Sequence, residues 1–549
     1  MVLDATSLPN DSETLKNLLL KTLAEKKEAE EKLEAQRAEF KTELDRLNYK
    51  MELFKLRFFG PRSEKLNFQP GQLELFNEAE DIASKTQKTE ETEKITYTRR
   101  KRGKRKKLDL SRFPSVDIVH DLSEEERIHS CGQKMKEIGS EKTYKLRVVP
   151  KQLLVEKHIR KKYACPCQGV DTEGKEGAVR IAPVPPQIIE KSIATPSLLA
   201  DVIVSKYCDA LPFYRQEKIL HRYGIEISRE TLSRWAMQVS DKLKVLQDMM
   251  QSDVLGWDVL AMDETPVQVL SEKDRKNETK SYMWVARGGP PGKPVILYQY
   301  HRTRAGEFVH NFLKDWQGTL ICDAYGGYDA GSRKLPIRLA GCWAHVRRRF
   351  VDLAKASKGE GCAVEAVEYI KQLYKIEKTA REQRLSYEQI RELRQEQSRP
   401  VTEEFKKWLD IKAGESPPKS PLGQAVRYPL GIWQKLLVYL EDGRVSIDNN
   451  LTENAIRPFV IGKKNWLFSA CPDGARASAF LYSIVETAKA NGLEPYWYLN
   501  YLFEKFPLSK GEDDYKALLP YNLTSEMVAS HLQVNATFTT YRQPDCARG

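Results

Sequence analysis

Three acidic residues in the second half of the chain have the type and the setting to hold divalent metal ions. Asp263 lies in the apolar, β-rich stretch GWDVLAMDETPVQVL, and Asp323 ends the short apolar stretch GTLICD. Buried carboxylates that lie close together repel one another unless a cation neutralises them, so a metal explains such a pair better than packing does. Two Mg²⁺ ions need a third carboxylate, and the best candidate is Glu453 in IDNNLTENAIRPFVIGKKNWLF.

The segment around Glu453 predicts a short helix that Asp448 caps and Pro458 ends. Asn449, Glu453 and Arg457 recur at i, i+4 and i+8 and therefore share one face of this helix. Glu453 can then point towards the two aspartates while Arg457 binds a neighbouring carboxylate or a phosphate group. Each of these acids, taken alone, is more often a surface charge than a metal ligand, so the argument depends on the elements that carry them.

The stretch from Gly256 to Cys342 alternates strands with one helix. Three β-rich segments, GWDVLAMDETPVQVL, SYMWVARG and PVILYQYH, are followed by the helical EFVHNFLKDW and by the strands GTLICD and IRLAGC. Three strands, a helix, a strand, a short link and a fifth strand is the order of a ribonuclease-H-like domain, whose first three strands form a meander. In that order the first and fourth strands are neighbours, which places Asp263 beside Asp323.

The composition indicates a basic, multidomain globular protein. A chain of 549 residues, 41% of them hydrophobic, is too long for one core. The formal net charge of +12 favours a polyanionic partner, either nucleic acid or an acidic membrane surface. No stretch approaches the roughly 18 apolar residues of a membrane span, and MVLDATSLPNDSETLK does not resemble a signal peptide. We therefore expect a cytoplasmic protein with no membrane partner, and the nine scattered cysteines do not suggest a disulfide framework.

Residues 13–58 contain no Gly or Pro and are rich in Leu, Glu, Lys and Ala, which favours one long helix. Apolar residues alternate four and three apart along one seam, at Phe40, Leu44, Leu47, Met51, Phe54 and Phe58. This spacing is typical of a coiled coil and predicts a homo-oligomer. A solvated helix packed on its own chain is the alternative.

A run of basic residues, RRKRGKRKK, follows at residues 99–107 and is too charged to be buried. We interpret it as a flexible basic linker. Its first four residues are candidate phosphate contacts, Arg99, Arg100, Lys101 and Arg102. A merely solvated linker is the equal alternative.

Two pairs of metal-binding residue types bracket the β-like segments TYKLRVV and QLLVEKHI. These are His129 with Cys131, and Cys165 with Cys167. Thiolate and imidazole ligands suit tetrahedral Zn²⁺, and a segment this small would gain much of its stability from a structural zinc ion. Three cysteines without metal near a turn are the alternative.

The segment LPFYRQEKILHRYGIEISRETLSRWAMQV predicts two helices joined at Tyr223–Gly224, the second capped by Ser228. This is helix-turn-helix spacing, and the second helix offers side chains to a DNA groove or backbone at Arg229, Thr231, Ser233 and Arg234. Helical hairpins of this kind also occur in proteins that bind no DNA.

Blocks along nearly the whole chain resemble one family of bacterial proteins. DNNLTENAIRPFVIGKKNWLF and YSIVETAKANGLEPYWYL look like the C-terminal signature of insertion-sequence transposases of the IS66 family. Other blocks resemble that family in the same order: LFKLRFFGPRSEKL, VDIVHDLSEEER, KSIATPSLLADVIVSKYCDALPFYRQEKIL, MDETPVQVL, CDAYGGYD and GCWAHVRRRF. Several long motifs agree, so the resemblance is specific.

The resemblance implies a D-D-E recombinase whose catalytic acids are Asp263, Asp323 and Glu453, holding two Mg²⁺ or Mn²⁺ ions. It also implies supporting or DNA-contacting roles for Asn450, Arg457, Lys463, Lys464, His345 and Arg347. The chain departs from the family pattern at Asn454 and Lys463, where Arg is usual or frequent. The zinc unit departs too, with Ile128, His129 and Cys131 in place of C-P-x-C.

The predicted protein is a multidomain α+β DNA transposase with a ribonuclease-H-like mixed α/β core. It would bind the terminal inverted repeats of an insertion sequence and join them to target DNA, with accessory proteins of the same element as candidate partners. A transposase-derived DNA-binding protein without catalysis and a ribonuclease-H-like nuclease are the alternatives. The predicted parts are a coiled coil (1–60), a basic linker (61–108), a zinc unit (109–172), a helix-turn-helix region (173–250), the core (251–352 and 441–490), a helical insertion (353–440) and a helical tail (491–549).

Overall fold

The computed structural model describes residues 151–164, 179–357 and 361–529, residues 51 and 133, and scattered positions between 11 and 32. The chain divides into two units, residues 86–182 in one and residues 1–85 with 183–549 in the other. The basic linker and the four predicted zinc ligands lie outside the described residues. Of the predicted coiled-coil seam, Met51 is described, and it is helical and exposed. Within the described part of the chain, no helix is long and apolar enough to cross a membrane.

The smaller unit contains an antiparallel pair of short strands, β1 (Lys162–Ala164) and β2 (Val179–Ile181). The predicted strand at residues 152–159 is wrong, because this segment has no regular secondary structure. Its alternating apolar residues have no buried face to cover, and the side chain of Val155 is 95% exposed. Alternation favours a strand only where neighbouring strands and a core accept it.

The larger unit is built on a mixed sheet with strand order β5-β4-β3-β6-β7, and a short strand, β8, also pairs with β3. The first three strands form the predicted antiparallel meander, and β6 and β7 run parallel to β3. The bounds are β3 Val259–Val269, β4 Lys280–Gly288, β5 Val295–His301, β6 Gly318–Cys322, β7 Ile337–Gly341 and β8 Phe468–Ser469.

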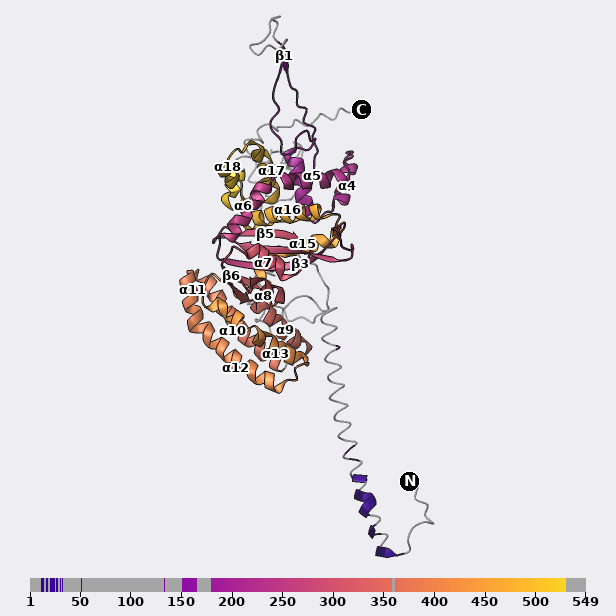
Figure 1. Cartoon of the computed structure of the whole chain (residues 1–549), viewed down its shortest axis with the longest axis vertical. Coiled ribbons are helices and arrows are strands. Elements are labelled where there is room, and N and C mark those ends of the chain that lie inside the picture. The colour runs from indigo at the N-terminus through magenta and orange to yellow at the C-terminus, as the bar shows by residue number, and fades with distance from the viewer. Residues whose placement is uncertain are drawn as a thin grey trace. The chain divides into compact units, whose positions relative to one another are not determined.

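Helices cover the sheet and its β5 edge. Helix α16 (Pro472–Ala490) lies along β5 (Figure 1). The hydroxyl groups of Ser483 and Thr487 accept hydrogen bonds from the outward backbone N–H groups of Tyr298 and Ile296, at 2.7 and 3.0 Å. An unpaired sheet edge is open to wrong strand pairing, and these bonds close it. On the other side, α7 (Gly306–Leu313) contacts the short helix α8 (Gly326–Ser332).

Within residues 183–258, four helices precede the sheet, and the helices after α16 pack partly against them. The first group is α3 (Pro196–Tyr207), α4 (Phe213–Arg222), α5 (Arg229–Lys242) and α6 (Lys244–Leu255). The second is α17 (Pro495–Lys505), the 3₁₀ turn η4 (Phe506–Leu508), α18 (Glu512–Ala517) and the turn η5 (Pro520–Asn522).

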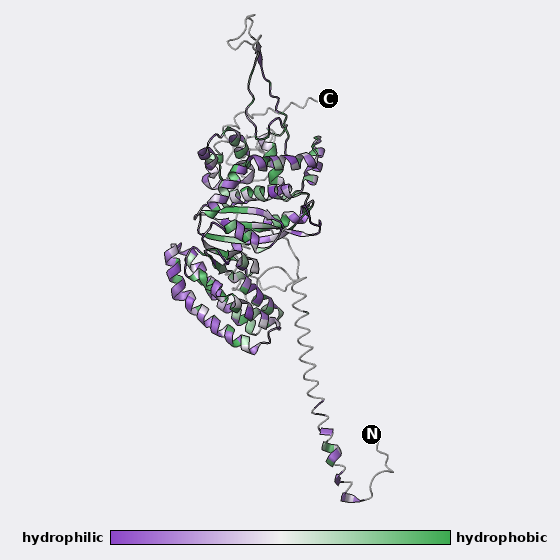
Figure 2. Ribbon diagram, viewed as in Figure 1, coloured by the Kyte–Doolittle hydropathy of each residue, from purple (hydrophilic) through white to green (hydrophobic). Residues whose placement is uncertain are grey.

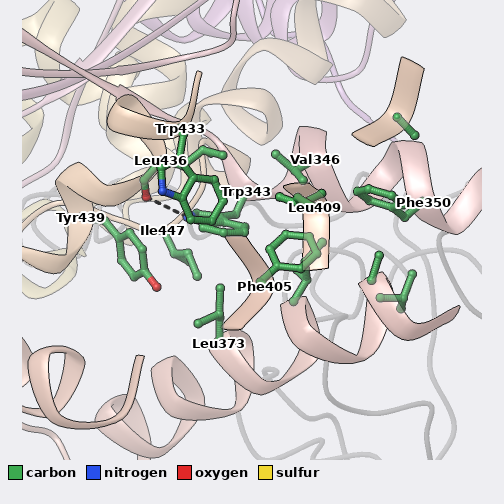
Figure 3. Close-up of a cluster of buried hydrophobic side chains, with 14 of the residues drawn as sticks. Trp343, Val346, Phe350, Leu373, Phe405, Leu409, Trp433, Leu436, Tyr439 and Ile447 are labelled. Carbon is green, nitrogen blue, oxygen red and sulfur yellow. Dashed lines mark hydrogen bonds between the residues drawn. The ribbon is translucent and has the colours of Figure 1, made fainter. Parts of the chain in front are cut away.

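A helical region lies in the sequence between β7 and the last core helix, α15 (Asn450–Trp466). Its core consists mainly of aromatic and aliphatic side chains, and the indole N–H of Trp343 donates to the carbonyl of Leu436 at 2.9 Å (Figure 3). The helices carry many hydrophilic residues on their outer side (Figure 2). They are α9 (Trp343–Ala356), α10 (Cys362–Glu382), α11 (Tyr387–Leu393), the π-helical η2 (Arg394–Ser398), α12 (Arg399–Glu415), α13 (Pro421–Gly431), α14 (Trp433–Leu437) and η3 (Val438–Leu440).

Candidate active site

The alternation of β3 places Asp263 and Glu264 on opposite faces of the sheet. Asp263 lies opposite Val285 of β4, which in turn lies opposite Tyr298 of β5. The hydroxyl group of Tyr298 donates to the carbonyl of Ala455 in α15, so these residues share the face that α15 covers. Glu264 is on the other face, with α7 and α8.

Asp323 lies beside Asp263 because β6 runs parallel to β3. Ala261 is the register partner of Ile321, and each aspartate follows two residues later. Asp323 comes directly after the end of β6, and its carboxylate accepts the backbone N–H of Tyr325 at 2.9 Å. The predicted strand order thus brings these two acids close together, each two residues beyond the paired Ala261 and Ile321.

Glu453 lies in the first turn of α15, which is anchored directly to β3. The N-cap of the helix is Asn449, and its side-chain amide donates to the carbonyl of Met262 at 2.9 Å, one residue before Asp263. The sequence predicted Asp448 as the cap. Asp448 instead accepts the backbone N–H of Asn450 from just before the helix, at 3.1 Å.

The predicted end of this helix at Pro458 is wrong, because α15 continues to Trp466 with the proline inside it. An interior proline removes one backbone donor and costs about 3 kcal/mol. Burial of the following turns offsets that cost. Phe459 is fully buried and packs on Tyr482 of α16 with ring centroids 5.3 Å apart, and Gly462 leaves room for the same tyrosine.

Asp263 is surrounded by other carboxylates. Burial, together with the negative charges of Glu264, Glu453 and Asp323, raises its pKa to about 8, although a hydrogen bond from the backbone N–H of Glu264 at 2.8 Å opposes the shift. The carboxylate form is therefore disfavoured at Asp263. A divalent cation among these acids would favour it instead.

Glu264 is also buried, and burial raises its pKa, but a hydrogen bond from Tyr328 and the positive charge of Arg304 oppose that shift. Its side chain is 1% exposed, forms an ion pair with Arg304 at 2.5 Å and accepts the hydroxyl group of Tyr328 at 2.5 Å. The guanidinium group of Arg304 also lies 3.7 Å from the centre of the Tyr325 ring. Because the backbone of Tyr325 holds Asp323, this network also positions the loop that carries the second acid.

Glu453 contacts two basic side chains of α9. Nε2 of His345 lies 3.7 Å from its Oε1, and a guanidinium nitrogen of Arg348 lies 3.4 Å from its Oε2. Oε1 itself is buried and has no hydrogen-bond partner. The sequence indicated His345 and Arg347 but missed Arg348, although spacing of i, i+3 from His345 could have identified it. Arg347 is buried, and its charge acts on Tyr374, which donates to Asp448.

The other predicted supporting residues have three kinds of environment. The amide of Asn450 donates to Asp448 at 2.7 Å. The ammonium group of Lys463 donates to the carbonyl of Pro266 and so attaches α15 to β3. Arg457 and Lys464 are exposed and free to meet solvent or a phosphate group.

A group of metal-ligand types that the sequence did not indicate overlaps this site. Within the described residues, Cys342, His345 and Glu453 form the single group of three such side chains whose ligand atoms all lie within 4.8 Å of one another. Asp263 and Asp323 are not part of this close group.

Helices α4 and α5 have the predicted helix-turn-helix form. The turn contains Gly224 with a φ of 81°, a left-handed conformation that suits glycine. Ser228 caps α5 by accepting the backbone N–H of Thr231 at 3.3 Å. Among the predicted contact residues, Arg229 and Arg234 are exposed, whereas Thr231 and Ser233 are half-buried.

Comparison with known families identifies the chain. A model of the transposase IS66 family matches residues 191–477, more than half of the chain. The chain belongs to this family. The IS66 C-terminal element matches residues 483–521, and a model described as Transposase C of IS166 homeodomain matches residues 46–116. The zinc-finger binding domain of transposase IS66 matches residues 129–168, a range that contains all four predicted zinc ligands.

Related proteins occur in Sinorhizobium fredii (strain NBRC 101917 / NGR234). The uncharacterized protein y4qI is 30% identical over 96% of this chain and 100% of its own length. The uncharacterized protein y4jD is 31% identical over 76% of this chain and 81% of its own length. The IS66-family likeness therefore extends over almost the entire chain.

Proposed function

We propose that this IS66-family protein is a D-D-E transposase that cleaves the ends of an insertion sequence and joins them to target DNA. Asp263, Asp323 and Glu453 would be its metal ligands on a ribonuclease-H-like core. The observation that carries the proposal is their common setting. Asp263 and Asp323 follow paired residues of the parallel strands β3 and β6, the start of α15 that carries Glu453 is anchored to β3, and the negative charges of Glu453 and Asp323 both act on the buried Asp263.

These acids suit divalent metal ions. The raised pKa of Asp263 favours its protonated form, and a nearby cation would favour the carboxylate form instead. Oε1 of Glu453 is a buried acceptor without a hydrogen bond. Two Mg²⁺ or Mn²⁺ ions held by the three carboxylates would stabilise the negative charge that develops on the attacked phosphate. The carboxylates themselves bind no phosphate, so ground-state DNA binding must come from basic groups.

The chain's own residues orient the reacting groups. His345 and Arg348 direct Glu453 from α9, and the bond from Asn449 to Met262 fixes the distance of α15 from β3. In the first reaction a water oxygen attacks the phosphodiester and the 3′ oxygen of the element leaves. In the second, that 3′-OH attacks target DNA and the target's 3′ oxygen leaves. We propose that Arg457 and Lys464, which are both exposed, contact phosphates beside these centres.

The remaining parts of the chain would bind DNA and join the subunits of the oligomer. We propose that α4 and α5 contact the terminal repeats, and that the linker at residues 99–107 adds phosphate contacts in a cytoplasmic protein. Residues 13–58 would make it a homo-oligomer. Sedimentation of the intact chain and of a chain starting at Gly60 tests this, and equal oligomeric states would contradict it.

One structural zinc ion is proposed for His129, Cys131, Cys165 and Cys167. Metal analysis should find one zinc ion fewer in the Cys165→Ser protein than in the natural protein. Equal zinc contents would contradict this site.

The test of the whole function is a strand-transfer assay. Purified protein is given DNA that carries the inverted repeats flanking its gene, with Mg²⁺ and target DNA. Cleavage at the repeat ends and joined products are expected. Repeat binding without cleavage would identify a DNA-binding protein, and cleavage of RNA or hybrid duplexes alone would identify a ribonuclease-H-like nuclease.

A further inference from the structure

We infer that Cys342, His345 and Glu453 form a site for a thiophilic divalent metal such as Zn²⁺, and that a metal bound there withdraws Glu453 from the acids on β3 and β6. The binding part of this inference stands on the geometry alone. Its inhibitory part rests on the proposed function. The site is separate in sequence from the zinc unit at residues 129–168.

The three ligand atoms have the chemistry and spacing of a zinc site. Sulfur, imidazole nitrogen and carboxylate oxygen together favour Zn²⁺, whereas Mg²⁺ prefers oxygen alone. Bonds of about 2.0–2.3 Å in a tetrahedral site separate the ligand atoms by roughly 3.3–3.8 Å. The 3.7 Å between His345 Nε2 and Glu453 Oε1 already falls in that range, and all three atoms lie within 4.8 Å. Three protein ligands leave a fourth position open, which suits reversible binding.

The fold holds these ligands in place before any metal binds. Cys342 is the N-cap of α9, and His345 follows three residues later in its first turn. The thiol accepts the backbone N–H of Asn449 at 3.3 Å, and Asn449 is the N-cap of the helix that carries Glu453. One contact therefore joins the starts of both helices. Cys342 is 1% exposed, whereas the side chain of His345 is 27% exposed and so can be reached from solvent.

The charges around the group permit a dication. Burial raises the pKa of the Cys342 thiol, and the negative charges of Asp448 and Glu453 raise it further. The same two negative charges favour a dication beside the thiol. Arg348 opposes a cation, but it binds Oε2 of Glu453 and leaves Oε1 without a hydrogen bond. When Zn²⁺ binds, the S–H bond breaks, the S–Zn bond forms and the proton passes to solvent. A thiolate and a carboxylate then balance the two positive charges of the ion.

The consequence is competition for one carboxylate. Oε1 of Glu453 cannot bind an ion beside Cys342 and at the same time bind a metal ion together with Asp263 and Asp323. Zn²⁺ should therefore inhibit strand transfer that is supported by Mg²⁺, and a chelator should restore it. The same residue would give the protein its third catalytic ligand and its sensitivity to thiophilic metals.

Co²⁺ titration of the full-length protein, with the metal of its zinc unit left in place, tests the binding. A thiolate ligand gives Co²⁺ a charge-transfer absorption in the near ultraviolet. We expect the natural protein to bind one more equivalent with this absorption than Cys342→Ser, a variant that should fold because serine is a good N-cap. Cys471→Ser is the matched control, since Cys471 also caps a helix and accepts the backbone N–H of Gly474 at 3.4 Å. Equal titrations of all three proteins would overturn the site.

Zn²⁺ inhibition of strand transfer tests the consequence. Half-inhibition of Cys342→Ser should need at least about tenfold more Zn²⁺ than that of the natural protein or Cys471→Ser. Equal sensitivity, with the Co²⁺ difference present, would contradict the inhibition and leave the binding site standing. Absence of strand transfer from every protein would contradict the proposed function, and the Co²⁺ titration would still decide the site.

Discussion

Two regions of the molecule bury charge in contrasting ways. In the helices between β7 and α15, Glu377 forms a complete ion pair with Arg394, whose Nε and Nη2 donate to both carboxylate oxygens at 2.8 Å. The remaining nitrogen, Nη1, donates to the carbonyls of Tyr439 and Val445. On β3, Asp263 faces other carboxylates, and its pKa rises to about 8. A buried charge with all its partners serves the fold, whereas buried like charges indicate a site that a cation completes.

The same contrast separates two adjacent residues of β3. Burial raises the pKa of both residues, but Glu264 has Arg304 and Tyr328 as partners on one face of the sheet, whereas the side-chain charges that act on Asp263 are those of other carboxylates. The two residues are adjacent in sequence, so the difference between their partners comes from the face of the sheet on which each side chain lies.

The largest expected effect is loss of chemistry at the three acids proposed to bind metal. Asp263→Ala, Asp323→Ala and Glu453→Gln should each reduce cleavage and joining at least about 10⁴-fold, roughly 5 kcal/mol of transition-state stabilisation. Removing a carboxylate ligand misplaces a metal ion, while DNA affinity depends on Lys and Arg. Strand-transfer rates and binding to the repeat ends measure the two effects separately. Near-normal cleavage by Asp323→Ala would refute the second ligand.

Breaking the Glu377–Arg394 ion pair should reduce the stability of the protein and leave the reaction largely unaffected. Glu377→Ala leaves Arg394 buried without its carboxylate, which should cost about 3–5 kcal/mol. Denaturant unfolding followed by the fluorescence of the nearby tryptophans measures this loss. At low temperature, where the variant stays folded, strand transfer should remain close to normal. A strong loss of activity in fully folded protein would show that this pair serves the reaction and not only the fold.

A smaller effect concerns the pH dependence of stability without metal. The folded pKa of Asp263 is about 8, above its ordinary value of 3.8. The folded protein therefore binds this proton more tightly than the unfolded chain between those values. The stabilisation is complete below about pH 4 and is lost as the pH rises through 8. In EDTA, the melting temperature of Asp263→Asn relative to that of the natural protein should rise by a few degrees between pH 5 and pH 8.

Mg²⁺ provides the control for that experiment. The ion should stabilise the natural protein at pH 8 and leave Asp263→Asn little changed, because the variant lacks one ligand. Parallel pH profiles of the two proteins in EDTA would mean that Asp263 is not held among carboxylates.

The sequence predicted the parts of this site that depend on local patterns. Apolar runs and alternation identified the strands, and their order placed Asp263 beside Asp323. Packing between distant segments determined the rest. Pro458 stays inside a helix because Phe459 packs on Tyr482 of α16, a contact between distant segments that local sequence patterns do not predict.

Other features were missed for the same reason. Arg348 meets Glu453, and Cys342 receives the N–H of Asn449, across more than 100 residues of chain. The zinc unit and the coiled coil stay predictions from sequence, the first of them supported by the family model over residues 129–168.

The smallest expected effect is at Asp329, which lies six residues after Asp323 and is the nearest alternative to it in CDAYGGYD. The structure pairs its carboxylate with Lys435 at 2.5 Å, and the Asp329 side chain is 46% exposed. Exposed ion pairs contribute about 0–1 kcal/mol, so Asp329→Ala should keep its stability and stay within about threefold of normal strand transfer. Glu264 is a poorer control than its place in the sequence suggests, because its removal leaves Arg304 and Tyr328 without their buried acceptor. Strand-transfer rates of Asp329→Ala and Asp323→Ala, measured side by side, decide between the two acids. If Asp329→Ala were inactive and Asp323→Ala active, the carboxylate beside Asp263 would not be the second ligand, and the register of β3 with β6 would no longer explain the site.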